Sequence, residues 1–241
     1  MKIIQSKLLN QFENLIQGFT TKSNGNIAFH VNDARIKVIQ NHRQLATLLS
    51  YDIESLVHMQ QVHKTDVRIL QGDENFYAPP TCDALITNKR NIPLMVMVAD
   101  CSPLLFYDAN KKAIAVVHAG RMGAFENIIQ ATITSFEKNF NSHTKDIYVS
   151  VGPSIRECCY EVGLEVFEEA KNLNLEFATS IKKNSYYLNI SKILHQQLLD
   201  AGIEEKNMEF SQECTACSTQ KYFSYRAEQN TGRFAGVLML T

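Results

Sequence analysis

Cysteine and histidine side chains stand at the ends of apolar runs in this 241-residue sequence. Cys101 follows the run PLMVMVA and precedes Ser-Pro, whose proline disfavours helix at the residue before it. The cysteine is therefore predicted near a strand end, and Asp100 beside it needs a partner if it is buried. His118 closes a second apolar run, AIAVVHAG, ahead of Arg-Met-Gly and a helix. Such a strand-to-helix passage offers backbone N–H groups to an anion or an oxyanion.

His63 is the third candidate and is predicted in the middle of a strand, in MQQVHKTDV. The turn YDANKKA between the strands of Cys101 and His118 predicts that these two strands are neighbours. Two imidazoles and one thiolate are the donor set of a catalytic zinc site with a free fourth position, and copper accepts them too. The separations of 38 and 17 residues fit no local zinc motif. A structural role for each histidine, or a Cys101 nucleophile with His118 as its base, therefore stays open.

Charged residues elsewhere offer weaker candidates. Asp83, in TCDALITN, is either a carboxylate at a strand start or the partner of a metal-binding histidine. Arg226 and Arg233 lie in KYFSYRAEQNTGRFAG and are either part of a solvated turn or a pair of cations that hold a phosphate. Lys22 could join them.

Four further cysteines are predicted to be structural. Cys214 and Cys217 form a C-x2-C pair with no second such pair in the sequence. The adjacent Cys158 and Cys159 are not expected to join them around one ion.

The composition is that of an ordinary soluble globular protein, with 45% hydrophobic and 20% charged residues. The net charge of -1 and the pI of about 6.7 argue against nucleic acid or an anionic membrane as a partner. The N-terminus lacks the apolar stretch of a signal peptide, and no run of about 18 uncharged apolar residues suggests a membrane span. A cytoplasmic protein with reduced cysteines is therefore expected.

Strand and helix patterns mix along the chain without a strict alternation. Strands are predicted at 57–70, 83–88, 93–100, 103–108, 113–120, 146–155, 186–190, 208–213 and 234–240. Helices are predicted at 33–50, 124–140, 163–174 and 191–202, with Asp33 and Ser191 as the N-terminal caps of the first and last. The run PLMVMVA does not alternate, which is typical of a strand buried on both faces. These patterns predict a mixed α/β fold, with helices covering the sheet, in a single domain over 1–241.

Six stretches together resemble the YfiH family in order and approximate spacing: QVHKTDV, CDALITN, ADCSPLLFYD, AVVHAG, GPSIRECCYEVG and FSYRAEQNTGRFAG. Members of that family are called multicopper polyphenol oxidase-like proteins, purine nucleoside phosphorylases or peptidoglycan editing factors. The resemblance implies that His63, Cys101 and His118 bind one metal ion, usually zinc. It also implies a four-layer α/β/β/α sandwich similar to the catalytic domain of cytotoxic necrotizing factor toxins, which use a Cys/His pair for deamidation.

Two motifs depart from the family pattern, at three positions. The family usually has H-A-G-W followed by a basic residue and glycine, whereas this chain has Arg121 in place of the tryptophan and Met122 in place of the basic residue. Lys64 stands where Q-V-H is usually followed by glycine. Arg121 is therefore expected to supply the missing charge. The expected substrate contacts are Lys22, Gln61, Arg121, Arg226 and Arg233.

The resemblance implies a zinc-dependent purine nucleoside enzyme, acting by phosphorolysis of adenosine, inosine, guanosine or methylthioadenosine and by adenosine deamination. The H-x-E signature of nucleoside deaminases is absent, so Asp83 or Asp100 is expected to move the proton. One alternative is a Cys/His hydrolase of amide or peptide bonds in peptidoglycan precursor quality control. A copper-dependent phenol oxidase ranks third, because a multicopper oxidase needs about ten histidine ligands and this chain has seven histidines. The expected partners are small molecules, a purine nucleoside and phosphate, and a monomer is favoured.

Overall fold

The computed structural model describes residues 3–241, and its centre is a six-stranded mixed sheet. Its strand order is β11 (Met208–Phe210), β7 (Ile147–Val151), β5 (Ser102–Asp108), β6 (Ala113–Ala119), β3 (Ala84–Thr87) and β2 (Val67–Ile69). The β11–β7 and β2–β3 pairs are parallel, and the others are antiparallel. The mixed α/β class predicted from the sequence is therefore confirmed.

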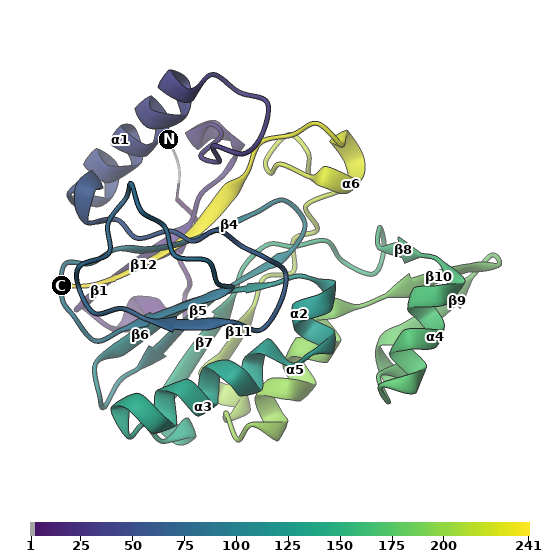
Figure 1. Ribbon diagram of the computed structural model, residues 1–241. Helices are drawn as coiled ribbons and strands as arrows, with labels where there is room; N and C mark the ends of the chain where they lie inside the picture. Colours follow the sequence, from purple (N-terminus) through teal and green to yellow (C-terminus); the bar gives the residue numbers. More distant parts are fainter. Residues whose placement is uncertain (1–2) are drawn as a thin grey trace.

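A second sheet, antiparallel and three-stranded, packs on one face of the first (Figure 1). It consists of β1 (Leu15–Phe19), β12 (Phe234–Leu240) and β4 (Leu94–Val98). Helix α1 (Arg35–Leu49) covers its outer face, where Leu45 packs with Met95, Met97 and Val237.

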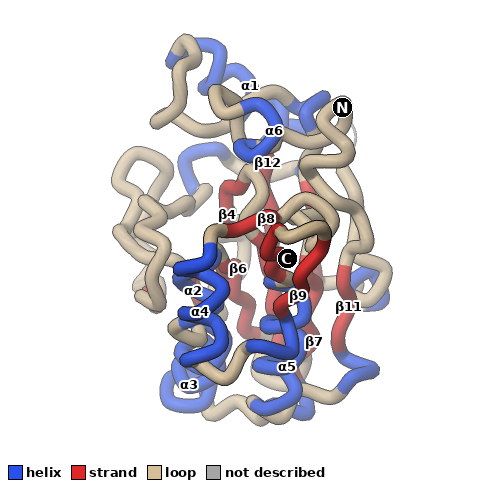
Figure 2. The backbone as a smooth tube through the Cα atoms, turned by 90° about the vertical axis from the view of Figure 1, so that its right-hand side faces the viewer, coloured by secondary structure: helices blue, strands red, loops and turns tan. Residues whose placement is uncertain are grey.

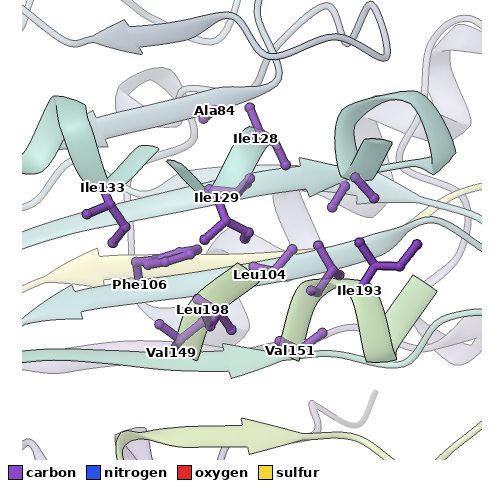
Figure 3. Packing of buried hydrophobic residues seen from close by; sticks show 14 of the residues in the cluster. Ala84, Leu104, Phe106, Ile128, Ile129, Ile133, Val149, Val151, Ile193 and Leu198 are labelled. Carbon is purple, nitrogen blue, oxygen red and sulfur yellow. The ribbon is translucent and has the colours of Figure 1, made fainter. Parts of the chain in front are cut away.

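Helices α3 (Ile128–Phe140) and α5 (Ile190–Asp200) cover the opposite face of the six-stranded sheet. Figure 3 shows Ile129 and Ile133 of α3 and Ile193 of α5 meeting Leu104 and Phe106 of β5. The intervening residues Leu105 and Tyr107 point to the other sheet. Successive side chains of a strand face opposite sides, so β5 is buried on both faces and cannot show an alternating pattern.

The remaining elements lie at one end of the molecule. A small sheet of β8 (Glu161–Val162), β10 (Ser185–Leu188) and β9 (Thr179–Lys182) carries α4 (Leu164–Asn172) and extends beyond the six-stranded sheet. Figure 2 shows this small sheet from the front, with α6 (Tyr225–Glu228) above it. Helix α2 (Arg121–Phe125) begins directly after β6. No helix within residues 3–241 has the length and apolar character needed to cross a membrane.

Several predicted boundaries are corrected by the structure. The strand predicted over 57–70 is reduced to β2, preceded by isolated bridges at Val57 and Gln60. The helix predicted over 124–140 is broken at Asn127, whose φ of 62° is left-handed and whose side chain caps α3 by accepting the N–H of Gln130. The caps also differ: α1 has Ala34 at its N-cap instead of Asp33, and α5 has Asn189 instead of Ser191.

Candidate metal centre between two cavities

His63 lies in a tight turn, not in the strand expected for it. Its φ is 61°, and the turn is wrapped around the fully buried Asp83. One carboxylate oxygen of Asp83 accepts the N–H of His63 at 3.0 Å, and the other accepts the N–H groups of Lys64 at 2.9 Å and Val62 at 3.3 Å. A buried carboxylate needs such partners, so it fixes the backbone that presents His63.

Gln61 anchors the same turn to the three-stranded sheet. Its side-chain amide donates to the carbonyl of Met97 at 2.8 Å, and its oxygen accepts the N–H of Met97 at 3.0 Å. Gln61 was expected to contact substrate, and it does line a cavity. Both ends of its amide, however, are engaged by β4, so its contribution is to hold the turn.

Cys101 follows a sharp corner between β4 and β5. Asp100 forms this corner with a φ of 88°, a conformation that is uncommon outside glycine. Its two carboxylate oxygens accept the hydroxyl of Thr215 and the N–H of Arg226, both at 2.6 Å. These contacts hold the Asp100 side chain in place, and the role of proton carrier expected for it stays a prediction.

His118 reaches Cys101 because β6 pairs with β5, with Ser102 opposite Ala119. Its Nδ1 hydrogen-bonds Asp83 at 2.8 Å, which leaves Nε2 as the available ring nitrogen. Asp83 thus takes the second of its two expected roles, as the partner of a histidine, and its four interactions leave no free oxygen for a proton carrier.

The three predicted ligands meet at this end of the sheet. One ligand atom each from His63, Cys101 and His118 lies within 4.8 Å of the other two. The two imidazole rings are 4.7 Å apart at 88°. Gly120 packs against all three, since a Cβ built there would lie 3.1 Å from His63 Cδ2 and 3.2 Å from Cys101 Sγ. The absence of a side chain at this position lets the three groups converge.

The neighbouring charges favour a thiolate at Cys101. Burial opposes ionisation of the thiol, but His118 and His63 outweigh it and lower its pKa to about 6. Burial likewise lowers the pKa of His118, but the Cys101 thiolate and the Asp83 carboxylate outweigh it and raise the pKa to about 9. For Asp83, hydrogen bonds from His118 and the turn overcome burial and lower the pKa of the carboxyl.

Cys101 lies between two cavities. The larger, about 720 Å³, is lined on the site's side by His63 and Arg233 and elsewhere mostly by aromatic and apolar groups. The smaller, about 280 Å³, is lined by Arg121, Arg226 and Tyr160 among others. Cys101 and Tyr225 contribute to both cavities.

The three cations predicted to hold phosphate do not converge. Arg226 lines the smaller cavity, whereas Arg233 lines the larger. Lys22 lines neither, because its ammonium is held by the carboxylate of Glu228 and the carbonyl of Thr219. The expectation for Lys22 is therefore corrected.

Comparison with known proteins shows which family the chain belongs to and which proteins it resembles in sequence. The family model described as "Multi-copper polyphenol oxidoreductase laccase" matches residues 17–241. The chain belongs to this family. It is 30% identical to "Purine nucleoside phosphorylase YlmD" of Bacillus subtilis over 239 residues, covering 91% of this chain and 86% of that protein. It is 32% identical to "Purine nucleoside phosphorylase Cgl2154/cg2365" of Corynebacterium glutamicum, covering 92% and 93%.

Solved structures of family members share the fold. The YfiH protein of Bacillus licheniformis superimposes with a TM-score of 0.90 at 30% identity, covering 97% of this chain and 94% of that one. YlmD from Geobacillus stearothermophilus gives a TM-score of 0.87 at 28% identity, covering 95% and 93%. The resemblance to the YfiH family is therefore confirmed, and the chain is related to enzymes.

The structure explains how the chain accommodates both departures from the family pattern. The residue of this turn with a positive φ, which favours glycine, is His63 and not Lys64. The backbone at position 64 therefore does not require the glycine that the family usually has there. Arg121 begins α2 and lines the smaller cavity, with its guanidinium paired to Glu169 at 2.6 Å. Its charge therefore lies beside the site, as expected from the sequence.

Other residues of the larger cavity were not singled out from the sequence. They are mainly aromatic residues and histidines from separate segments: Phe29, His30, His58, Phe76, Tyr77 and Tyr225. Of these residues, only Tyr225 could have been suspected from the sequence, because it is an aromatic residue next to Arg226 in FSYRAE. The others come from loops whose meeting depends on the tertiary fold, so their local sequence does not mark them.

Proposed function

We propose that this protein is a zinc-dependent purine nucleoside enzyme. The phosphorolysis substrates proposed are adenosine, inosine, guanosine and methylthioadenosine, and adenosine is also deaminated. The observation that carries the proposal is the position of Cys101. It lies with two histidines at the boundary between a large, mostly aromatic and apolar cavity and a smaller one lined by two arginines. Relatives named as purine nucleoside phosphorylases support it.

The donor groups fit zinc. Two imidazoles and a thiolate-prone cysteine converge within 4.8 Å, and Asp83 orients His118 in the way that carboxylates commonly orient zinc-binding histidines. His63, Cys101 and His118 would hold the ion. When bound, zinc supplies a Lewis acid with an open fourth position.

The larger cavity suits a purine nucleoside. Its volume of about 720 Å³ falls within the usual range for small-molecule sites, about 300–1,000 Å³. Phe76, Tyr77 and Tyr225 offer faces and edges on which a planar base can pack. The base then lies among apolar groups, and Arg233 and His63 mark the polar end toward Cys101.

The smaller cavity suits phosphate. Arg121 and Arg226 line it, and a guanidinium fork matches phosphate oxygens. Arg226 is held in place because it donates to the carbonyl of Cys159 at 2.9 Å and stacks on the ring of Tyr160 at 5.2 Å. Phosphate in this cavity would approach the sugar from the side opposite the base, as displacement at C1′ requires.

Turnover of the four nucleosides tests the proposal directly. With inorganic phosphate, chromatography should show free base and ribose 1-phosphate (methylthioribose 1-phosphate from methylthioadenosine). Without phosphate, adenosine should still give inosine. The matched control omits protein, and no consumption of any of the four nucleosides would contradict the proposal.

A Cys/His hydrolase is the second candidate, favoured by one observation. Cys101, His118 and Asp83 are arranged as nucleophile, base and orienting carboxylate, and the lowered pKa of Cys101 suits a nucleophile. The four-layer sandwich and the similarity to the catalytic domain of cytotoxic necrotizing factor toxins, which the family resemblance implies for the fold, stay predictions.

Alkylation of Cys101 by iodoacetamide separates the two candidates. For the zinc enzyme, the thiol should be protected until a chelator removes the ion; for the hydrolase, it should react without chelator. In chelated protein the labelling rate should fall as the pH drops through about 6, since the thiolate predominates only above its lowered pKa. Peptide mass spectrometry reports each cysteine separately. Cys82 is the internal control, because burial raises its pKa to about 12 and it should stay unlabelled.

A copper-dependent phenol oxidase is the third candidate. Only two of the seven histidines join Cys101 in the metal-binding group found within residues 3–241. A single copper ion at the same donors could support weak oxidation, since copper competes well with zinc at nitrogen and sulfur. The single domain over 1–241, the monomeric state and the cytoplasmic location stay predictions.

A further inference from the structure

Four cysteines form a second cluster, away from Cys101. The ligand atoms of Cys158, Cys159, Cys214 and Cys217 all lie within 4.8 Å of one another. Cys217 Sγ is 3.6 Å from Cys158 Sγ and 3.3 Å from Cys159 Sγ. The structure therefore brings the adjacent pair and the C-x2-C pair into one cluster, which the expectation of two separate structural pairs did not foresee.

Parallel pairing of β7 and β11 produces the cluster. Phe210 lies opposite Val151, and the two chains continue side by side to a bridge between Ser154 and Cys214. The N–H of Thr215 donates to the carbonyl of Ser154 at 3.1 Å. The segments then turn together, which brings the two cysteine pairs into one place although 55 residues separate Cys159 from Cys214.

We propose that this cluster is a tetrathiolate zinc site. Zinc–sulfur bonds of about 2.3 Å in a tetrahedron place the sulfurs roughly 3.8 Å apart, close to the separations of Cys217 from Cys158 and Cys159. A C-x2-C pair is a common half of such a site. The N–H of Arg156 donates to Cys214 Sγ at 3.4 Å, as expected beside a thiolate that binds a metal.

A metal explains the cluster better than a disulfide does. A disulfide requires only two sulfurs about 2.0 Å apart, whereas here four converge and Cys217 is almost equally close to two of them. Cys158 and Cys217 are exposed, so an ion can enter from solvent.

The site would fasten two loops that support the Cys101 centre. Thr215, between the two cysteines of the C-x2-C pair, donates its hydroxyl to Asp100. Cys159 accepts a hydrogen bond from Arg226, and Tyr160 follows it in the wall of the smaller cavity. An ion that binds the folded chain and not the unfolded chain stabilises the fold by its binding free energy. Its role would therefore be structural, and it would shape the smaller cavity at a distance.

Zinc content of the full chain with Cys101 replaced by alanine tests this site independently of the first one. Under reducing conditions, C101A should bind one zinc ion per chain, and the double variant C101A/C217S should bind none. Addition of Co²⁺ to metal-free C101A should produce sulfur-to-cobalt charge-transfer absorption of a four-thiolate site, weakened in the double variant. C101A/C82A is the matched control and should behave like C101A, because Cys82 lies outside both clusters.

Thermal unfolding completes the test. Removal of zinc should lower the midpoint temperature of thermal unfolding of C101A. The same treatment should leave the midpoint temperature of C101A/C217S unchanged. C101A/C158S serves as the second variant if the first fails to fold. The proposal is overturned if reduced C101A binds no zinc, or if loss of Cys217 leaves the zinc content unchanged. It is also overturned if a Cys159–Cys217 disulfide forms where zinc was expected.

Discussion

Replacement of His63 with asparagine is expected to lower kcat/KM for nucleoside phosphorolysis by about 1,000-fold or more, about 4 kcal/mol of transition-state stabilisation. Asparagine tolerates the left-handed backbone at this position and keeps the N–H that Asp83 accepts. The variant therefore removes the imidazole and preserves the turn. The zinc content should fall by one ion per chain, measured by elemental analysis beside the rate.

His143→Asn is the matched control for this variant. His143 is also exposed, lies before a short 3-10 turn, and is far in sequence from every residue of the site. The same chemical change there should leave zinc content and turnover unchanged. If His63→Asn retained both the ion and the rate of the unchanged protein, the three-ligand centre would be refuted.

The central strands could be predicted from the sequence because a strand that is buried on both faces has apolar residues at consecutive positions. Both faces of β4 and β5 are covered, so the apolar residues run without interruption as LMVMV in β4 and as PLLFY in β5. The hairpin of β5 and β6 follows from its short turn, and it alone places Cys101 beside His118. Two of the three candidate ligands therefore follow from local signals.

His63 shows where local signals fail. The alternation in KTDVRIL suggested a longer strand, but the backbone before it leaves the sheet to wrap around Asp83. Asp83 is 20 residues further along the chain and its buried charge determines the turn, a constraint that no window of the sequence contains. The four-cysteine cluster escaped prediction for the same reason, because parallel pairing of β7 and β11 creates it.

The positive charges near the site were also only partly predictable. Arg121, Arg226 and Arg233 do reach the cavities beside Cys101, as their motifs suggested. Lys22 does not line either cavity, because its side chain is held against Glu228 on α6 and the carbonyl of Thr219. The direction in which such a long side chain extends depends on its partner, and Glu228 is 206 residues away in the sequence.

Asp83→Asn is expected to have the second-largest effect, a loss of zinc affinity of about 10–100-fold. The carboxylate accepts hydrogen bonds from three turn N–H groups and from His118, so an amide would turn an NH2 group toward at least one of these donors. Each buried donor left without an acceptor costs about 1–3 kcal/mol, so the midpoint of thermal unfolding should also fall. Zinc titration of the metal-free protein measures the affinity, and calorimetry measures the midpoint.

The lowered pKa of Asp83 gives this interaction a pH dependence with a definite sign. Its carboxyl stays ionised in the folded protein below the pH at which an ordinary aspartate is protonated. The stability that it contributes is therefore present above the ordinary aspartate pKa and is lost as the pH falls through the lowered value. Asp83→Asn should show less loss of stability over this acidic range than the unchanged protein.

Asp108→Asn provides the matched control, since Asp108 is equally buried and ends the strand that begins beside Cys101. One of its oxygens accepts the N–H groups of Asn110 and Lys111, while the other has no partner, so an amide can replace the carboxylate without meeting a donor. Zinc affinity should be unchanged in this variant. Equal losses of affinity in the two variants would mean that buried charge at any point of the sheet matters, and would remove Asp83 from its role in orienting His118.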